Sequence, residues 1–317
     1  MTQRLRATEM GTKAHGLLAD PYGRWTVLAS VSGAIYLESD REEVLWMGRG
    51  GSARHRRAIL LSNMPSRLPA PGTPCGLHGG SLSMGDELVV DLADAAVWRP
   101  DLAVRREGRG ARRSGRLADA IRRAAMQSAP RGRFMRAAFP ALPDADSGSG
   151  ETVGATIATA IQRGIAALGR AAAGGDLSEG LERAAGLIGL GEGLTPSGDD
   201  FLGAFLFTLR MLDRTLPVPY RMDWQFIGGW LRCVKPLTNK ISYAVLADHA
   251  RGEAGEALSA LLHATLAGSS QRELVQLAWP VAEIGHSSGW DMLSGVYCAS
   301  SVLSSRAQDQ RGLEFEG

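Results

Sequence analysis

The sequence predicts an α+β protein, with a β-rich N-terminal domain at 1–104 and a mainly helical C-terminal domain at 151–317 that carries a Gly-rich loop. Short runs rich in β-branched and aromatic residues occupy 25–98. Apolar stripes at helical period recur from 151 onward. Between the two, residues 105–150 are first arginine-rich and then turn-rich, which predicts a basic connector and a linker.

Gly, Pro, Ser and Asp separate the strand-like runs of the N-terminal domain, as is typical of turns. In chain order these runs read WTVLAS, AIYLES, VLWMG, AILLS, ELVVDLA and AVWRP. The segment 65–85 lies between the fourth and fifth runs and is rich in proline and glycine. We expect a long loop there.

The stretch 105–136 is strongly basic but contains a single aromatic residue, Phe134. The chain as a whole is nearly balanced, with a formal net charge of +2. A nucleic-acid adaptor would use this run, but the charge pattern does not favour one. We expect a solvated helical connector, with a subunit contact or an anion-collecting rim as the alternatives.

Helical patterns follow the turn-rich linker at 140–150. An Ala-rich helix is expected from Glu151 to about Ala173, and the sequence Asp176-Leu-Ser-Glu179 opens the next one. Further apolar stripes at helical period cover 239–250, 255–267, 272–284 and 290–304. The sequence assigns no structure to 224–233, and residues 304–317 predict a frayed polar tail.

Composition limits the class of protein. No apolar run approaches the roughly 18 residues of a membrane span, and the first residues lack the apolar region of a secretory signal. The three cysteines, Cys75, Cys233 and Cys298, are odd in number and widely spaced. We therefore expect buried thiols without disulfides, in a reducing cytoplasm.

The segment 186–207, GLIGLGEGLTPSGDDFLGAFLF, carries the strongest functional signal. Gly189, Gly191 and Gly193 allow positive φ or close approach to a ligand. The run from Ser197 to Asp200 fits a helix start, with Ser197 as the cap. A purely structural cap and tight connection is the alternative. The loop lacks the Gly-Lys-Ser/Thr of a P-loop and the glycine spacing of a dinucleotide fold.

The same pattern occurs twice, as SGDDFLGAF at 197 and SGWDMLSGV at 288. Helix starts present unpaired N–H groups and the positive end of the helix dipole, which favour anions. We expect the two starts to converge on one anion pocket. The alternative is two independent, well-capped helices.

Other candidates surround these starts. His286 suits proton transfer near neutral pH, or is simply a packed histidine. The stretch from Lys235 to Ser242 supplies donors and positive charge, or a cap with solvated lysines. Asp199 and Asp200 could hold Mg²⁺ or orient a substrate N–H. Adjacent helical side chains diverge by about 100°, so we expect one to cap and one to face the ligand.

The segment GLGEGLTPSGDDFLGAF, with LTNKIS at 237–242 and IGHSSGWDMLSG at 284–295, resembles the AllH-like family, which includes a subunit of bacterial oxamate carbamoyltransferase. The resemblance covers 186–300 and is loose over the N-terminal third. It implies a cytoplasmic, multisubunit transferase of allantoin and purine degradation. In that reaction a carbamoyl group passes between carbamoyl phosphate and the amide nitrogen of oxamate, with two other subunits as partners.

From the chemistry and spacing of these segments we expect catalytic roles for Asp199, Asp200 and His286. Substrate binding is expected from Gly191, Gly193, Thr195, Ser197, Gly198, Lys235, Thr238, Asn239, Ser242, Ser287, Ser288 and Asp291. Mg²⁺ is the one candidate cofactor, and neither nucleic acid nor membrane is an expected partner. The alternative function is a non-catalytic small-anion-binding or regulatory subunit of a purine or ureide degradation complex.

Overall fold

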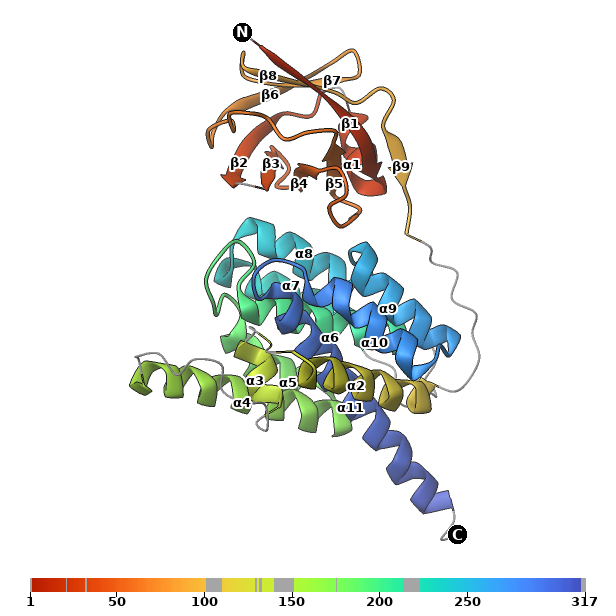
Figure 1. Ribbon diagram of the computed structural model, residues 1–317. Helices are drawn as coiled ribbons and strands as arrows, with labels where there is room; N and C mark the ends of the chain where they lie inside the picture. Colours follow the sequence, from red (N-terminus) through yellow and green to blue (C-terminus); the bar gives the residue numbers. More distant parts are fainter. Residues whose placement is uncertain are drawn as a thin grey trace. The chain divides into compact units, whose positions relative to one another are not determined.

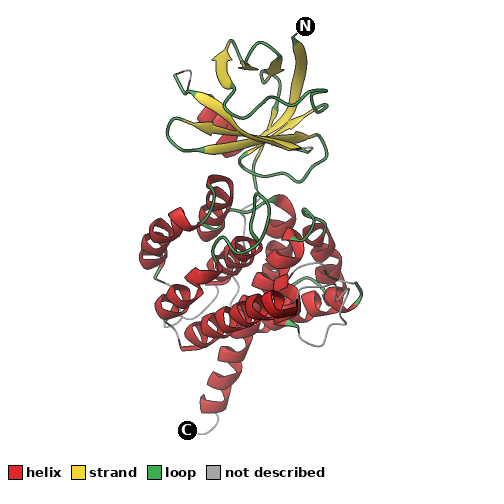
Figure 2. Ribbon diagram, turned by 90° about the vertical axis from the view of Figure 1, so that its left-hand side faces the viewer, coloured by secondary structure: helices red, strands yellow, loops and turns green. Residues whose placement is uncertain are grey.

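The computed structural model describes residues 2–100 except 21 and 32, 110–139 except 129, 131 and 132, 151–213 except 175, and 223–314. The chain divides into two compact units, 1–102 and 103–317. Strands dominate the first unit and helices the second (Figures 1 and 2). The protein is therefore α+β, as the sequence predicts.

The N-terminal unit is a nine-stranded sheet with one short helix among its described residues. Its elements are β1 (Gln3–Gly11), α1 (Thr12–Leu18), β2 (Trp25–Val31), β3 (Ala34–Ser39), β4 (Val44–Arg49), β5 (Ala58–Leu61), β6 (Pro74–His78), β7 (Ser81–Met84), β8 (Leu88–Asp91) and β9 (Ala96–Trp98). The strand order is β5-β4-β3-β2-β6-β7-β8-β1-β9. An antiparallel pairing of β1 with β5 closes the sheet on itself around a core that includes Ile35, Leu37 and Met47.

The predicted long loop at 65–85 is wrong in its second half, which forms the β6–β7 hairpin. His78 pairs with Ser81, so Gly79 and Gly80 are the two turn residues, and their φ angles are 55° and 78°. Two-residue hairpin turns of this kind need positive φ at both positions, which glycine supplies. Pro74 stands at the first residue of β6, where proline is tolerated.

A carboxylate between two cations links α1 to β4 and β5. Glu43 Oε2 lies 2.8 Å from Lys13 Nζ and 3.0 Å from Arg57 Nη1. The Arg57 side chain is 3% exposed. Burial alone raises the pKa of Glu43, but Lys13 and Arg57 together hold that pKa below its ordinary value.

The C-terminal unit is helical. Its elements are α2 (Gly110–Met126), α3 (Arg133–Ala138), α4 (Glu151–Gly174), α5 (Leu177–Ala184), η1 (Ala185–Leu187), α6 (Ser197–Asp213), α7 (Trp224–Val234), η3 (Lys235–Leu237), α8 (Lys240–Ala250), α9 (Glu256–Ala267), α10 (Gln271–Ala282) and α11 (Ser288–Glu314). None of the helices searched in the described ranges is long and apolar enough to cross a membrane.

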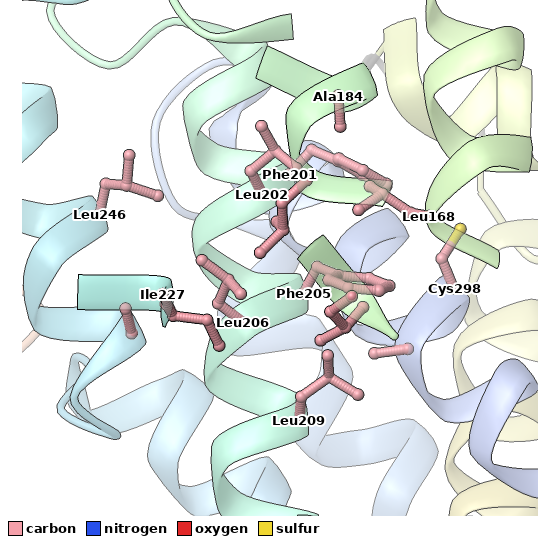
Figure 3. Packing of buried hydrophobic residues seen from close by; sticks show 14 of the residues in the cluster. Leu168, Ala184, Phe201, Leu202, Phe205, Leu206, Leu209, Ile227, Leu246 and Cys298 are labelled. Atoms are coloured by element: carbon pink, nitrogen blue, oxygen red, sulfur yellow. The ribbon is translucent and has the colours of Figure 1, made fainter. Parts of the chain in front are cut away.

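Helix α6 is the centre of this unit. Phe201 and Phe205 belong to one buried cluster, whereas Ala204 and Phe207 on the other side belong to a second. Figure 3 shows the first cluster, with side chains of α6 facing those of neighbouring helices. A Cβ on Gly295 of α11 would lie 2.2 Å from the carbonyl oxygen of Phe201, so the two helix backbones are in direct contact.

The arginine-rich stretch is only partly a solvated connector. Helix α2 buries Leu117 and Ile121 in the second cluster, so it is a core helix. Arg113 Nη1 donates to the carbonyl oxygen of Leu266 at 2.5 Å, and Arg116 donates to that of Ser269. Both arginines therefore satisfy carbonyls at the end of α9. Residues 101–109 and the predicted linker at 140–150 lie outside the described residues.

Two other segments differ from expectation. Residues 224–233, left unassigned above, belong to α7, and the Asp223 side chain caps that helix by accepting from Gln225 N and Phe226 N. The predicted frayed tail is helical as far as Glu314, because α11 continues through it. Of the cysteines, Cys75 and Cys298 are buried, as expected, but Cys233 is exposed.

Candidate functional site

Asp199, in the first turn of α6, joins the glycine loop to the turn before α8. One carboxylate oxygen accepts from Gly189 N at 2.8 Å. The other accepts from Ser242 Oγ at 2.6 Å and from Thr238 Oγ1. The side chain is buried at 3% exposure, and three donors occupy it. Asp199 therefore acts within the chain, by fixing two loops against α6.

Two glycines of the loop are needed because backbone approaches them closely. Gly189 has a φ of 73°, and a Cβ there would lie 2.4 Å from the carbonyl oxygen of Leu237. Gly191 has a φ of 124°, and its Cβ would lie 2.7 Å from Ser197 N. Gly193 also has positive φ, with open space around it. Of these three glycines, Gly193 is the one whose Cβ position has no neighbouring atom within 4 Å.

Asn239 fixes the same loop from the other side. Its Nδ2 donates to the carbonyl oxygen of Leu194 at 3.0 Å, while its Oδ1 accepts from Ser242 N and caps α8. The cap interpretation is therefore correct for Asn239, which also holds the loop. The ammonium of the exposed Lys235 lies 5.6 Å from the ring centroid of Tyr243.

The two Ser-Gly helix starts are built alike. Gly198 N donates to the carbonyl oxygen of Leu190, and Gly289 N to that of Ile284, both at 2.9 Å. A Cβ on Gly198 would lie 1.8 Å from Leu187 O, and one on Gly289 would lie 2.0 Å from Val281 O. Each glycine thus admits a backbone carbonyl against the helix. The repeated pattern has a structural cause at this position.

Ser197 is not the cap that the sequence predicts. It is the first residue of α6, and the first helical bonds go to the carbonyl oxygen of Pro196, from Asp199 N at 2.9 Å and Asp200 N at 3.1 Å. Proline suits a helix start because it has no N–H to satisfy. Ser288 is likewise the first residue of α11, and Asp291 N donates to Ser287 O at 3.0 Å.

The two starts converge, because Thr195 Oγ1 lies 3.1 Å from Ser288 Oγ. Asp200 and Asp291 occupy the fourth position of their helices and are close enough for their charges to interact. Asp200 also hydrogen-bonds with Ser288 and Thr195. We call these four residues, Thr195, Asp200, Ser288 and Asp291, the Asp200 cluster.

Asp200 is the chemically unusual member. It is 3% exposed, and its Oδ2 is buried without a hydrogen-bond partner. Burial raises the pKa of Asp200 well above its ordinary value. The charges of Asp291 and Asp199 raise it as well, while the hydrogen bonds from Ser288 and Thr195 lower it. A raised pKa favours the protonated form of a carboxyl group, which can donate a hydrogen bond.

Asp291, by contrast, receives a backbone donor. Its Oδ1 accepts from Phe134 N at 3.2 Å, which ties α3 to the start of α11. Within the described ranges no group of three His, Cys, Asp or Glu side chains is placed to hold a metal ion. Asp199 bonds to Gly189, Thr238 and Ser242, whereas Asp200 bonds to Thr195 and Ser288, so the structure gives no support to joint chelation of Mg²⁺.

The expected residues fall into three sets by exposure. Gly198, Asp199, Asp200, Ser242 and Asp291 are buried; Thr195, Ser197, Thr238, Ser287 and Ser288 are half-buried; and Gly191, Gly193, Lys235, Asn239 and His286 are exposed. The side chains that hydrogen-bond to Asp199 and Asp200 all belong to the first two sets. His286 lies in the exposed turn before α11 and outside these contacts.

Sequence reasoning missed the backbone partners of the site, Gly189 N and the carbonyl of Leu194, because backbone groups leave no sequence signal. It also missed His249, which is buried with Nδ1 unpartnered. A Cβ on Gly203 of α6 would lie 2.7 Å from that nitrogen. Burial lowers the pKa of His249 to about 4, although the charge of Asp248 raises it.

Comparison with known proteins finds one family model that matches part of the chain. Residues 187–300 match the family model described as oxamate carbamoyltransferase subunit AllH. This segment is therefore similar to the AllH family. It contains the glycine loop, the turn before α8 and both helix starts, which are the segments that meet at Asp199 and Asp200. No curated protein and no solved structure matches the chain.

Proposed function

We propose that the chain is a subunit of a carbamoyltransferase that acts on oxamate or a related small amide or ureido carboxylate, with carbamoyl phosphate as the other substrate. One observation carries the proposal. The AllH match covers the segments that contact one another at Asp199 and in the Asp200 cluster, although these segments lie up to 93 residues apart in sequence.

The chemistry sets what such a site has to do. The amide nitrogen of oxamate attacks the carbonyl carbon of carbamoyl phosphate and loses a proton. A C–N bond forms while the C–O bond to phosphate breaks, which yields oxalurate and phosphate. Charge develops on the carbonyl oxygen and on the departing phosphate, so placed hydrogen-bond donors accelerate the step.

The Asp200 cluster supplies donors of this kind. A neutral Asp200 carboxyl donates where an ionised one only accepts. The backbone N–H groups of Ser197 and Ser288 stand at the first positions of α6 and α11 and have no acceptor in the described part of the chain. Lys235 and His286 are exposed groups for charge balance and proton transfer in this proposal.

A regulatory, non-catalytic subunit is the second candidate. The full occupation of Asp199 by donors of its own chain favours it, because a residue so engaged orders loops and has no free oxygen for chemistry. In both cases we place the chain in a cytoplasmic complex with two other subunits, in allantoin or purine degradation.

The test reconstitutes the chain with its partner subunits and follows phosphate release from carbamoyl phosphate in the presence of oxamate. We expect activity in the complex and its loss when Ser288→Ala is combined with Thr195→Val, with assembly intact. The matched control is Ser269→Ala, at the end of α9 and outside the cluster. Full turnover in the double variant would favour the regulatory alternative. No transfer by any of the complexes, wild type included, would exclude the carbamoyltransferase proposal.

A further inference from the structure

A pocket separate from the Asp200 cluster opens between α4, α5 and η1. Its volume is 470 Å³. Small or apolar residues form its base, among them Gly164, Ala167 and Leu187. Pockets that bind small molecules combine apolar walls of this kind with a few placed polar groups.

Three arginines supply the polar groups. Arg163 and Arg170 lie two helical turns apart on α4, roughly 10 Å along the axis. Arg183 comes from α5 and pairs with Glu179 at 2.6 Å, an exposed contact of small energetic value. The described lining contains no acidic side chain. The described lining therefore presents three guanidinium groups, one of them paired with Glu179, and such groups fit carboxylate and phosphate in a fork geometry.

Leu187, which lines this pocket, is also the first residue of the segment that matches AllH. The Leu187 side chain lies 2.6 Å from the position of a Cβ on Gly164, so α4 and η1 are in close contact. The carbonyl oxygen of the same residue packs on Gly198 at the start of α6. A ligand in the pocket would therefore rest on the residue that supports the glycine loop.

We propose that this pocket binds a small organic anion in which carboxylate or phosphate groups are attached to a short apolar body. The anionic groups pair with Arg163 and Arg170, and the apolar body covers Ala167 and Leu187. This site is independent of the transferase proposal, because no residue of the Asp200 cluster lines it.

Isothermal titration of the full chain with glutarate and with phenyl phosphate tests the proposal and separates the carboxylate source from the phosphate source. We expect at least one probe to bind, and its Kd to rise tenfold or more in Arg163→Gln/Arg170→Gln, since each charge-assisted hydrogen bond contributes substantially to binding. Arg232→Gln removes an exposed helix arginine outside the pocket and should leave the Kd unchanged.

Ser288→Ala should also leave it unchanged, because Ser288 belongs to the other site. All titrations are run at one ionic strength, so that screening does not imitate a specific effect. Absence of binding by both probes would overturn the proposal. Binding that survives in the double arginine variant, or that is lost in Ser288→Ala, would overturn it equally.

Discussion

At the scale of single residues, two adjacent aspartates have opposite tasks. Asp199 is saturated by donors from the glycine loop and the turn before α8. Asp200 keeps a buried oxygen without a partner and lies against Asp291. The divergence follows from helix geometry, because neighbouring side chains point about 100° apart.

Replacement of Asp199 should mainly affect folding. In Asp199→Ala the donors of Gly189, Thr238 and Ser242 lose their acceptor, and we expect the free energy of unfolding to fall by about 3 kcal/mol. Urea denaturation measures this change, with Glu192→Ala in the exposed loop as the control. A change as small as that of the control would contradict the proposed role of Asp199.

Replacement of Asp200 should alter the pH dependence of stability. Because its pKa is raised in the folded chain, the folded state binds more protons than the unfolded state above pH ~4, and stability falls as pH rises from there toward the folded pKa. Asp200→Asn removes this loss, so its stability relative to wild type should increase as pH rises. A pH-independent difference between the two unfolding curves would contradict the raised pKa.

At the scale of elements, the two Ser-Gly helix starts explain their own repetition. In each, the glycine admits a carbonyl oxygen from the preceding segment, Leu187 O in one and Val281 O in the other. The repeated Ser-Gly sequence therefore reflects a structural requirement, because each helix begins where another segment packs tightly against it. The features of the repeat that bear on function are the contact between Thr195 and Ser288 and the interaction between Asp200 and Asp291.

These starts should not tolerate a methyl group. Gly198→Ala and Gly289→Ala bring a Cβ to 1.8 Å and 2.0 Å from backbone oxygen atoms, which cannot move as a side chain does. We expect each to destabilise the chain by about 3 kcal/mol. Gly228→Ala, within α7 and with open space around it, should instead be neutral or stabilising by up to about 1 kcal/mol. Thermal melts of the three variants measure these differences. Equal melting temperatures for the three variants would refute this explanation.

The N-terminal unit offers an electrostatic prediction of its own. Glu43→Gln removes the carboxylate that pairs with the buried Arg57, and we expect a loss of about 2 kcal/mol in the free energy of unfolding at neutral pH. Since the folded pKa of Glu43 is lowered, its contribution is present above pH ~4.3 and disappears as pH falls through the folded pKa. Glu87→Gln, in an exposed pair with Arg67, is the control and should change little. Equal losses for both would contradict the account.

At the scale of the whole molecule, the sequence predicts most helices and strands but fewer of the elements against which each one packs. Six strand runs and the helices around Phe201 follow from periodicity, which is a local property. The β6–β7 hairpin was missed although Gly79-Gly80 signals it, because the surrounding prolines favoured a loop. The burial of α2 was missed because its many arginines suggested a solvated helix, whereas its apolar face packs against α9, α10 and α11.

The candidate site follows the same division. The glycine loop and both helix starts are visible in the sequence, and so is the similarity of their segment to the AllH family. The roles of Asp199 and Asp200 cannot be read from the sequence, because they depend on which residues, distant in sequence, each carboxylate contacts. The arginine pocket left no motif, because its three charges come from two helices and are separated by small residues.

The most direct test of the central claim is the rate of carbamoyl transfer from carbamoyl phosphate to oxamate by the complex assembled with Asp200→Asn chain. The account predicts that Asn, which donates a hydrogen bond as a neutral carboxyl does, retains most of the rate, whereas Asp200→Ala in an equally well-assembled complex reduces it at least tenfold. Wild-type rates in both variants would contradict the claim that the Asp200 cluster takes part in transfer.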